Sequence, residues 1–278
     1  MKIEHAVHMR PALRLRWLTI ACFEVQIGDF SIVIDPCIAA SKRAPFGPEV
    51  VEKADVLLLS HGHWDHITDI KNLMDRFGCP LLCGELTAPS MLRMLNCNPK
   101  DIYPMTSNLE LDFGGAKIRA LFGRHTDQRK TLEDLTEKTK SNPLVNTPEM
   151  EACAFYGHME YRNYLITAPS GMRVLFWGND VTPAQLQMMR ELRPDVALLQ
   201  YTRQRPEELA RMVAAGGVKV LVPHHMDLTK DESEYAPLLA ALEREVHRAA
   251  PDCLVITPEK RKWYSFALTV EAESISNV

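Results

Sequence analysis

The sequence predicts an α/β protein whose strands and helices pack in layers, and three observations support this. The apolar residues 56–59 run continuously, as in a strand covered on both faces. Residues 56–96 repeat the order strand then helix, which indicates an α/β layer. Residues 13–17 and 23–27 alternate apolar and polar side chains, which is typical of antiparallel strands. A chain of 278 residues is near the upper limit for one core, so we expect a single domain over residues 1–278.

The N-terminal region is expected to form an antiparallel meander. The predicted strands cover 13–17, 23–27 and 30–34. Gly28 and Asp29 supply a turn, and the last strand ends at Asp35 and Pro36. Because Asp35 has no adjacent histidine, we expect it to support a ligand or a turn rather than to bind a metal itself. A short helix is predicted over 48–53.

Potential metal ligands follow the apolar strand directly. Residues 61–66 read His-Gly-His-Trp-Asp-His, and small residues at 60 and 62 allow a tight turn. That turn would direct His61 and His63 one way and Asp65 and His66 another. Imidazole and carboxylate suit zinc, manganese and iron, and several of them would be costly to bury without a cation. A single histidine here would usually belong to a hydrogen-bonded surface turn, but this set predicts a metal site with two groups of ligands.

The pattern His-x-His-x-Asp-His resembles the signature of the metallo-β-lactamase superfamily. The resemblance implies a four-layered αβ/βα sandwich, a site for one or two metal ions at one edge, and a hydrolase. The opening strands, Trp64 and the sequence Pro-His-His-Met-Asp at 223–227 are most similar to the L-ascorbate-6-phosphate lactonase group and its relatives. That similarity implies hydrolysis of a lactone or a phosphoester.

Helices and short strands are expected to alternate after the motif. Thr68 is predicted to cap a helix with apolar residues at helical spacing, and Gly78 is placed to end it. The following elements are a strand at 81–82, a helix at 87–96, and strands at 109–113 and 117–122.

His125 follows the end of the strand predicted at 117–122. The resemblance implies that it joins His61 and His63 around one metal. Residues 126–151 have no strong periodicity, and loops longer than about 15 residues are uncommon in compact domains. We therefore expect a partly helical insertion that covers the active site as a lid, with a subunit contact or a disordered segment as the alternatives.

The C-terminal half is expected to supply the second sheet and its helices. The predicted strands are 152–156, 161–167, 174–177, 196–199, 218–222, 254–256 and 263–268, and the helices are 182–192, 206–215 and 235–248. The superfamily has a Gly-Asp pair after the strand 174–177, and its carboxylate bridges two metals. Here Asn179 intervenes, so the resemblance implies Asp180 after a shift of one residue. The family pattern Pro-x-His-x-Asp selects His225 rather than His224.

The resemblance thus implies two metal sites that share a bridging carboxylate. The first consists of His61, His63 and His125, the second of Asp65, His66 and His225, and the bridge is Asp180. Two divalent ions, zinc or manganese by ligand type, can hold a hydroxide, lower the pKa of its parent water and polarise the bond under attack. We expect Asp65 also to orient the water and to pass a proton to the leaving group. The sequence contains no Gly-x-Ser-x-Gly elbow that would provide a protein nucleophile.

A loop with two arginines is the candidate for binding the substrate. Tyr201, Arg203 and Arg205 follow the strand 196–199, at the end where ligands collect in α/β layers. The arginines would hold a phosphate or carboxylate, and Tyr201 would add a hydroxyl. We therefore expect an anionic substrate that resembles a phosphorylated sugar. The alternative is a solvated loop whose arginines pair with the glutamates that follow.

The composition favours a small-molecule enzyme in a reducing compartment. The net charge of -4 and the pI near 6.2 do not fit a general nucleic-acid binder. Seven scattered cysteines indicate reduced thiols in a cytoplasmic protein. No segment has the roughly 18 consecutive apolar residues that span a bilayer, so we expect no membrane partner. The composition leaves a homo-oligomer open.

Three alternative functions stay open. A nuclease or phosphodiesterase of the same fold would act on nucleotides or RNA, but the sequence has no appended nucleic-acid-binding region. A redox diiron relative usually has glutamate at the place of His63, together with a flavin domain. A non-catalytic binding protein would be expected to have lost ligands, and this sequence keeps all seven.

Overall fold

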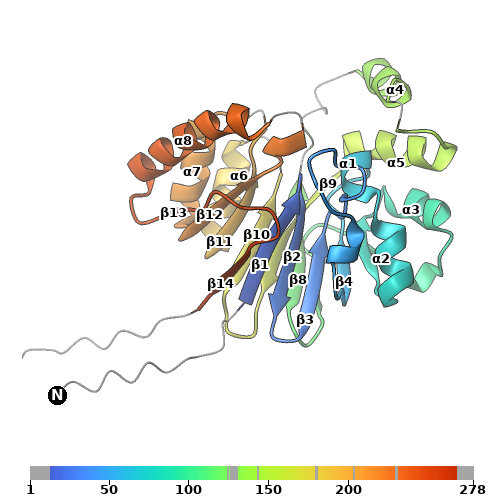
Figure 1. Cartoon of the computed structure of the whole chain (residues 1–278), viewed down its shortest axis with the longest axis horizontal. Helices are drawn as coiled ribbons and strands as arrows, with labels where there is room; N and C mark the ends of the chain where they lie inside the picture. The colour runs from blue at the N-terminus through green and yellow to red at the C-terminus, as the bar shows by residue number, and fades with distance from the viewer. Residues whose placement is uncertain are drawn as a thin grey trace, which may run out of the picture.

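Two seven-stranded sheets stack face to face, with helices on both outer faces (Figure 1). The structure, a computed structural model, describes residues 13–123, 125, 131–142, 144–178, 181–202, 204–228 and 231–267. The order of the layers is helix, sheet, sheet and helix. This is the expected αβ/βα sandwich.

The first sheet is built by the N-terminal half of the chain and closed by one C-terminal strand. Its order is β14-β1-β2-β3-β4-β5-β6, antiparallel from β14 to β3 and parallel from β3 to β6. The strands are β1 Leu13–Thr19, β2 Cys22–Ile27, β3 Phe30–Ile34, β4 Val56–Leu58, β5 Leu81–Gly84, β6 Ile102–Met105 and β14 Trp263–Phe266.

The second sheet repeats this mixed pattern in the opposite half of the molecule. Its order is β13-β12-β11-β10-β9-β8-β7, antiparallel from β7 to β10 and parallel from β10 to β13. The strands are β7 Glu110–Asp112, β8 Lys117–Gly123, β9 Tyr161–Thr167, β10 Arg173–Trp177, β11 Val196–Gln200, β12 Val220–His224 and β13 Leu254–Val255.

The helices fall into two outer groups (Figure 1). One group lies on the side of the first sheet and consists of α1 Trp64–Ile67, α2 Ile70–Phe77, α3 Ala88–Leu95, α4 Leu132–Lys140 and α5 Pro148–Met159. The other covers the second sheet, with α6 Pro183–Leu192, α7 Pro206–Gly216 and α8 Glu232–Ala249. Short 3₁₀ turns occupy Pro48–Val50, Pro99–Asp101 and Met226–Leu228. None of the helices in the described ranges is long and apolar enough to cross a membrane.

Most expected elements are present, and their ends follow the expected signals. Gly78 ends α2 with a φ of 64°, and the side chain of Thr182 caps α6. The N-terminal cap of α2 is Asp69 rather than Thr68. The short helix expected over 48–53 is only a single 3₁₀ turn.

Two predicted strands are wrong: one is part of a helix, and the other belongs to a different sheet. Residues 152–156 are not a strand, because they lie inside α5, which Thr147 caps by accepting from the amide of Met150. The strand near residue 263 does not complete the second sheet, because β14 pairs with β1 at the edge of the first sheet.

Large apolar side chains fill the space between the sheets. Trp17, Phe23, Tyr164 and Phe176 are each at most 1% exposed, and the rings of Phe23 and Phe176 meet edge to face. Burial of this apolar surface is the main source of stability, at roughly 25 cal/mol per Å². The packed layers therefore form a rigid base for the loops at the strand ends.

One buried hydroxyl joins the two sheets, and we expect its removal to destabilise the fold. The Tyr164 hydroxyl on β9 donates to the carbonyl of Leu59, at the end of β4, over 2.8 Å. Tyr164→Phe should lower the free energy of unfolding by about 1 to 2 kcal/mol in chemical denaturation, because it leaves a buried carbonyl with one donor fewer. Tyr103→Phe, at a side chain 41% exposed, is the matched control and should change it by less than about 0.5 kcal/mol. Equal stability of the two variants would contradict this role.

Candidate metal centre

His61, His63 and His125 form the first group of potential ligands. One ring nitrogen of each lies within 4.8 Å of the others, and Nε2 of His61 is 2.9 Å from Nδ1 of His63. His61 and His63 come from the loop after β4, whereas His125 follows β8 of the other sheet. The expected first set is thus brought together from both halves of the molecule.

The loop that carries His61 and His63 is shaped by Gly62. A Cβ atom at Gly62 would lie 2.2 Å from the backbone oxygen of Cys153 on α5, which is closer than atoms can approach. Only glycine therefore lets α5 pack directly on the loop. The buried strand β4 fixes the other side of the loop.

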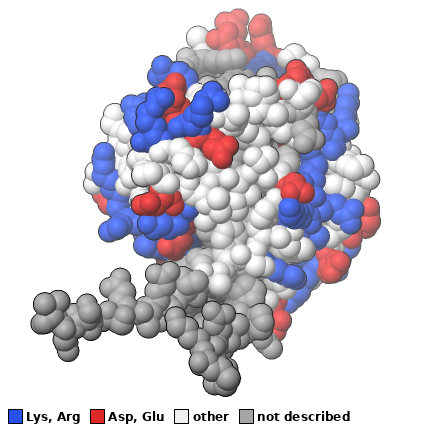
Figure 2. Space-filling model, turned by 60° about the vertical axis from the view of Figure 1, so that its left-hand side comes forward, with Lys and Arg blue, Asp and Glu red and all other residues white. Residues whose placement is uncertain are grey.

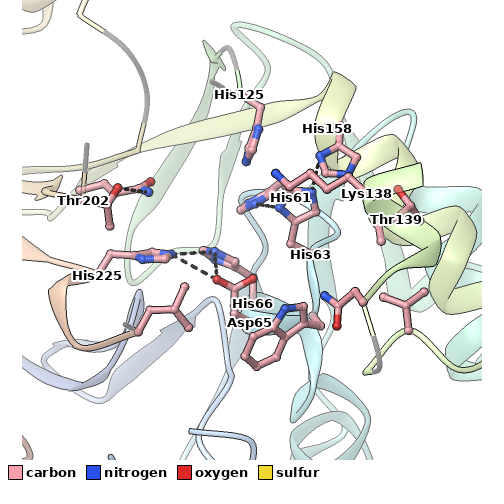
Figure 3. Close-up of a pocket in the computed structure, with 16 residues that line it drawn as sticks. His61, His63, Asp65, His66, His125, Lys138, Thr139, His158, Thr202 and His225 are labelled. Carbon is pink, nitrogen blue, oxygen red and sulfur yellow. Dashed lines mark hydrogen bonds and ion pairs between the residues drawn. The ribbon is translucent and has the colours of Figure 1, made fainter. Parts of the chain in front are cut away.

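Asp65, His66 and His225 form the second group. The Asp65 carboxylate is 3.6 Å from Nε2 of His66 and 3.4 Å from Nε2 of His225, and the two Nε2 atoms are 3.2 Å apart. All three side chains are buried. Figure 3 shows them directed toward one another below the first group.

These separations fit a divalent metal ion. Ligand atoms about 2.0 to 2.1 Å from a tetrahedral zinc lie about 3.3 to 3.4 Å from one another. The second group has separations of 3.2, 3.4 and 3.6 Å. Its donors, two imidazoles and one carboxylate, are also of the types that such ions accept.

Burial and neighbouring charges prepare the ligands for a cation. Burial lowers the pKa of His61 and of His63, and the surrounding imidazoles lower both further, so these rings are neutral and keep a lone pair. Burial alone would raise the pKa of Asp65, but His66 and His225 outweigh it and lower that pKa. Asp65 is therefore an ionised carboxylate at neutral pH.

Asp35 orients the ring of His66 by a hydrogen bond to Nδ1, the nitrogen that does not face the second group. Its carboxylate accepts from Nδ1 of His66 over 2.7 Å and from the amide of Ser60 over 2.7 Å. Burial lowers the pKa of His66, but the Asp35 and Asp65 carboxylates outweigh burial and raise that pKa. With the proton on Nδ1, the lone pair of Nε2 faces the second group. Asp35 thus supports a ligand, as expected.

The structure separates the two adjacent histidines at the end of β12. His225 has a φ of 73°, and its amide donates to the carbonyl of Ile20 over 2.8 Å, which directs its ring into the site. His224 is fully buried and packs between the rings of Phe23 and Phe176. His225 therefore faces the ligand group, and His224 faces the core.

Four predicted site residues remain: Asp180, Arg203, Tyr201 and Arg205. Asp180 and Arg203 lie outside the described residues. Tyr201 is 5% exposed and donates to the carbonyl of Leu238, while Arg205 pairs with Glu208 over 3.1 Å on the surface. Neither lines the pocket, so the structure does not support the expected anion clamp for Tyr201 and Arg205. Arg205 instead has the solvated arrangement considered as the alternative.

A pocket of about 310 Å³ opens above the two groups. The ligands form part of its lining, and α4, α5 and their connection contribute a further part: Lys138, Thr139, Asn142, Val145, Ala154 and His158. A cavity of this size suits a small molecule. Sequence reasoning missed His158 and Lys138. The signal for His158 was the helix start at Thr147 and Pro148, which places residue 158 on α5.

Comparisons with known proteins agree with the fold. Residues 14–225 match the family described as Beta-lactamase superfamily domain. The chain is 37% identical to a metal-dependent hydrolase of Aeropyrum pernix over 76% of this chain and 81% of that protein. It is also 37% identical to one of Archaeoglobus fulgidus, but only over 26% of this chain and 30% of that relative's length. A solved metallo hydrolase from Ignicoccus hospitalis is similar with a TM-score of 0.65 and 18% identity, over 92% of this chain and 99% of that one, which shows the fold.

Asp35→Asn should weaken metal binding by the second group. Asparagine tolerates the positive φ of 45° at this position, so the backbone is retained. Its amide would donate to Nδ1 of His66 and shift the ring proton to Nε2, the nitrogen that faces the group. We expect about 10- to 100-fold weaker binding of one equivalent of Zn²⁺ in a chelator competition titration. Asp75→Asn, on the exposed face of α2, is the control, and unchanged affinity in Asp35→Asn would contradict this role of Asp35.

Proposed function

The chain belongs to the beta-lactamase superfamily, and from this premise we propose that it is a metal-dependent hydrolase. The observation that carries the proposal is the pair of ligand groups facing one pocket. We propose zinc or manganese as the ion, and the imidazole-rich donors favour zinc. Bound at these groups, one or two such ions would supply a nucleophilic water at neutral pH and a Lewis acid for the bond under attack.

The residues of the chain have distinct roles in this proposal. His61, His63 and His125 would hold one ion, and Asp65, His66 and His225 would hold another, with Asp180 proposed as a shared ligand. Asp65, which its lowered pKa keeps ionised at neutral pH, would orient the attacking water through a hydrogen bond and pass a proton to the leaving group. The pocket wall excludes bulk water and positions the substrate.

We propose a lactone or phosphoester of a small anionic metabolite as the substrate. Lys138 supports the anionic part, because it extends from α4 toward the histidines (Figure 3) and lines the pocket. Among the described lining residues it is the one with a permanent positive charge, since the others are neutral, acidic or imidazole side chains. It takes the place of Tyr201 and Arg205 as the candidate partner of a phosphate or carboxylate.

Nucleotide or RNA hydrolysis is the second candidate, and the surface favours it less. On the face that Figure 2 shows, basic and acidic side chains are mixed around an uncharged centre. The net charge is -4. A long polyanion would need a continuous basic surface, so we prefer the small substrate.

Metal removal tests the proposed hydrolysis. Chelator-treated protein should lose hydrolysis of a panel of lactones and phosphodiesters, and Zn²⁺ or Mn²⁺ should restore it. His225→Ala should lose metal and activity, whereas His224→Leu should retain the metal, because His224 packs in the core. Hydrolysis that persists without metal, or equal metal loss in both variants, would refute the proposed site. Cleavage of RNA alone would favour the second candidate.

Lys138→Met tests the charge of the substrate. We expect KM for an anionic substrate to rise about 10-fold or more, the size of a lost charge-assisted hydrogen bond, with little change for a neutral ester of similar reactivity. Lys140→Met, on the exposed side of the same helix, is the control. Equal losses on both substrates would assign Lys138 a structural role only.

A further inference from the structure

His63 is held from both sides of its ring. Its Nδ1 lies 2.9 Å from Nε2 of His61, inside the first ligand group. Its Nε2 lies 3.0 Å from Nδ1 of His158, which comes from α5 and is 3% exposed. The two nitrogens of one imidazole therefore have separate partners, one in the ligand group and one outside it.

We propose that His158 is a positioning residue that fixes the ring tautomer of His63. A ring that accepts through Nδ1 carries its proton on Nε2, and this N–H donates to the lone pair of Nδ1 of His158. The lone pair on Nδ1 of His63 then faces His61 and His125, where a cation would bind. Hydrogen bonds of this kind hold metal-binding imidazoles in one orientation. The inference rests on the proposed metal-dependent function.

The packing of α5 makes this contact rigid. A Cβ at Gly157 would lie 2.8 Å from Cδ2 of His63 and 3.1 Å from the backbone of Gly62. A Cβ at Gly62 would in turn lie 2.2 Å from the backbone oxygen of Cys153. Gly157 on α5 and Gly62 in the loop that carries His61 and His63 thus let the two backbones lie against each other. The ring of His158, next in the chain after Gly157, is fixed relative to His63 by this contact.

The two ligand groups differ in the residue that hydrogen-bonds to the far nitrogen of a ligand imidazole. A carboxylate, that of Asp35, supports His66, whereas an imidazole, that of His158, supports His63. The residue that supports the first group belongs to α5, which also contributes Ala154 and His158 to the lining of the pocket. His158 therefore links the helical wall of the pocket to the first group.

The test compares two substitutions of His158 in the full-length protein. In His158→Asn the side-chain oxygen takes the place of Nδ1 as the acceptor, whereas His158→Leu retains the volume and removes the acceptor. In chelator competition, we expect His158→Leu to bind one of its two equivalents of Zn²⁺ about 10- to 100-fold more weakly than the wild type does. The affinity of His158→Asn should stay within a few-fold of wild type. Thermal unfolding of both metal-free variants shows whether each is folded.

A second readout follows the tautomer without any metal. NMR correlation spectra of the histidine ring nitrogens in the metal-free protein should show His63 protonated on Nε2 in the wild type and in His158→Asn. His158→Leu should show a mixture of tautomers. Unchanged tautomer and affinity in His158→Leu would overturn the proposal, and so would equal loss in both variants. Wild-type protein that binds no divalent ion would instead refute the proposed function, while the spectra would still test the contact.

Discussion

Six imidazole and carboxylate side chains converge at one end of the two sheets, and the surrounding structure holds them there. In the second group two imidazole nitrogens and one carboxylate oxygen face one another in a buried site, 3.2 to 3.6 Å apart. Such an arrangement is costly in a buried site and becomes favourable when a cation neutralises it. Asp35, Gly62 and the loop around His225 all act to keep these atoms in place.

Each ligand group draws on both halves of the molecule. His61 and His63 follow a strand of the first sheet, and His125 follows a strand of the second. Nearby, the carboxylate of Asp227 accepts from the amide of Ile20 over 2.9 Å, which joins the loop after β12 to the turn after β1. A cation at either group would therefore also connect the two sheets, and metal binding should add to the stability of the fold.

Local signals predicted the parts of the structure that depend on neighbouring residues. The continuous apolar run before His61, the cap at Thr182 and the glycine at 78 were sufficient for the strand and helices they mark. The spacing of residues 61–66 also separated the two ligand groups correctly in space.

Features that depend on distant contacts were predicted poorly. Residues 152–156 resemble a strand because α5 is apolar on several sides, where it meets both α3 and the ligand loop. The pairing of β14 with β1 joins the two ends of the described chain, which periodicity cannot specify. Tyr201 has a polar group, but its ring packs into the core beside α7 and α8, and this removes it from the pocket.

The close contact of α5 with the ligand loop has a consequence for how this scaffold can diverge. Substitutions on α4 alter the lining of the pocket, whereas a larger residue at 157 or 62 would move α5 and His63 together. Evolution of a new substrate preference is therefore expected to proceed through α4 and its connection. α5 is constrained, because it packs on the loop that carries His61 and His63, and every substrate of the site would require these ligands.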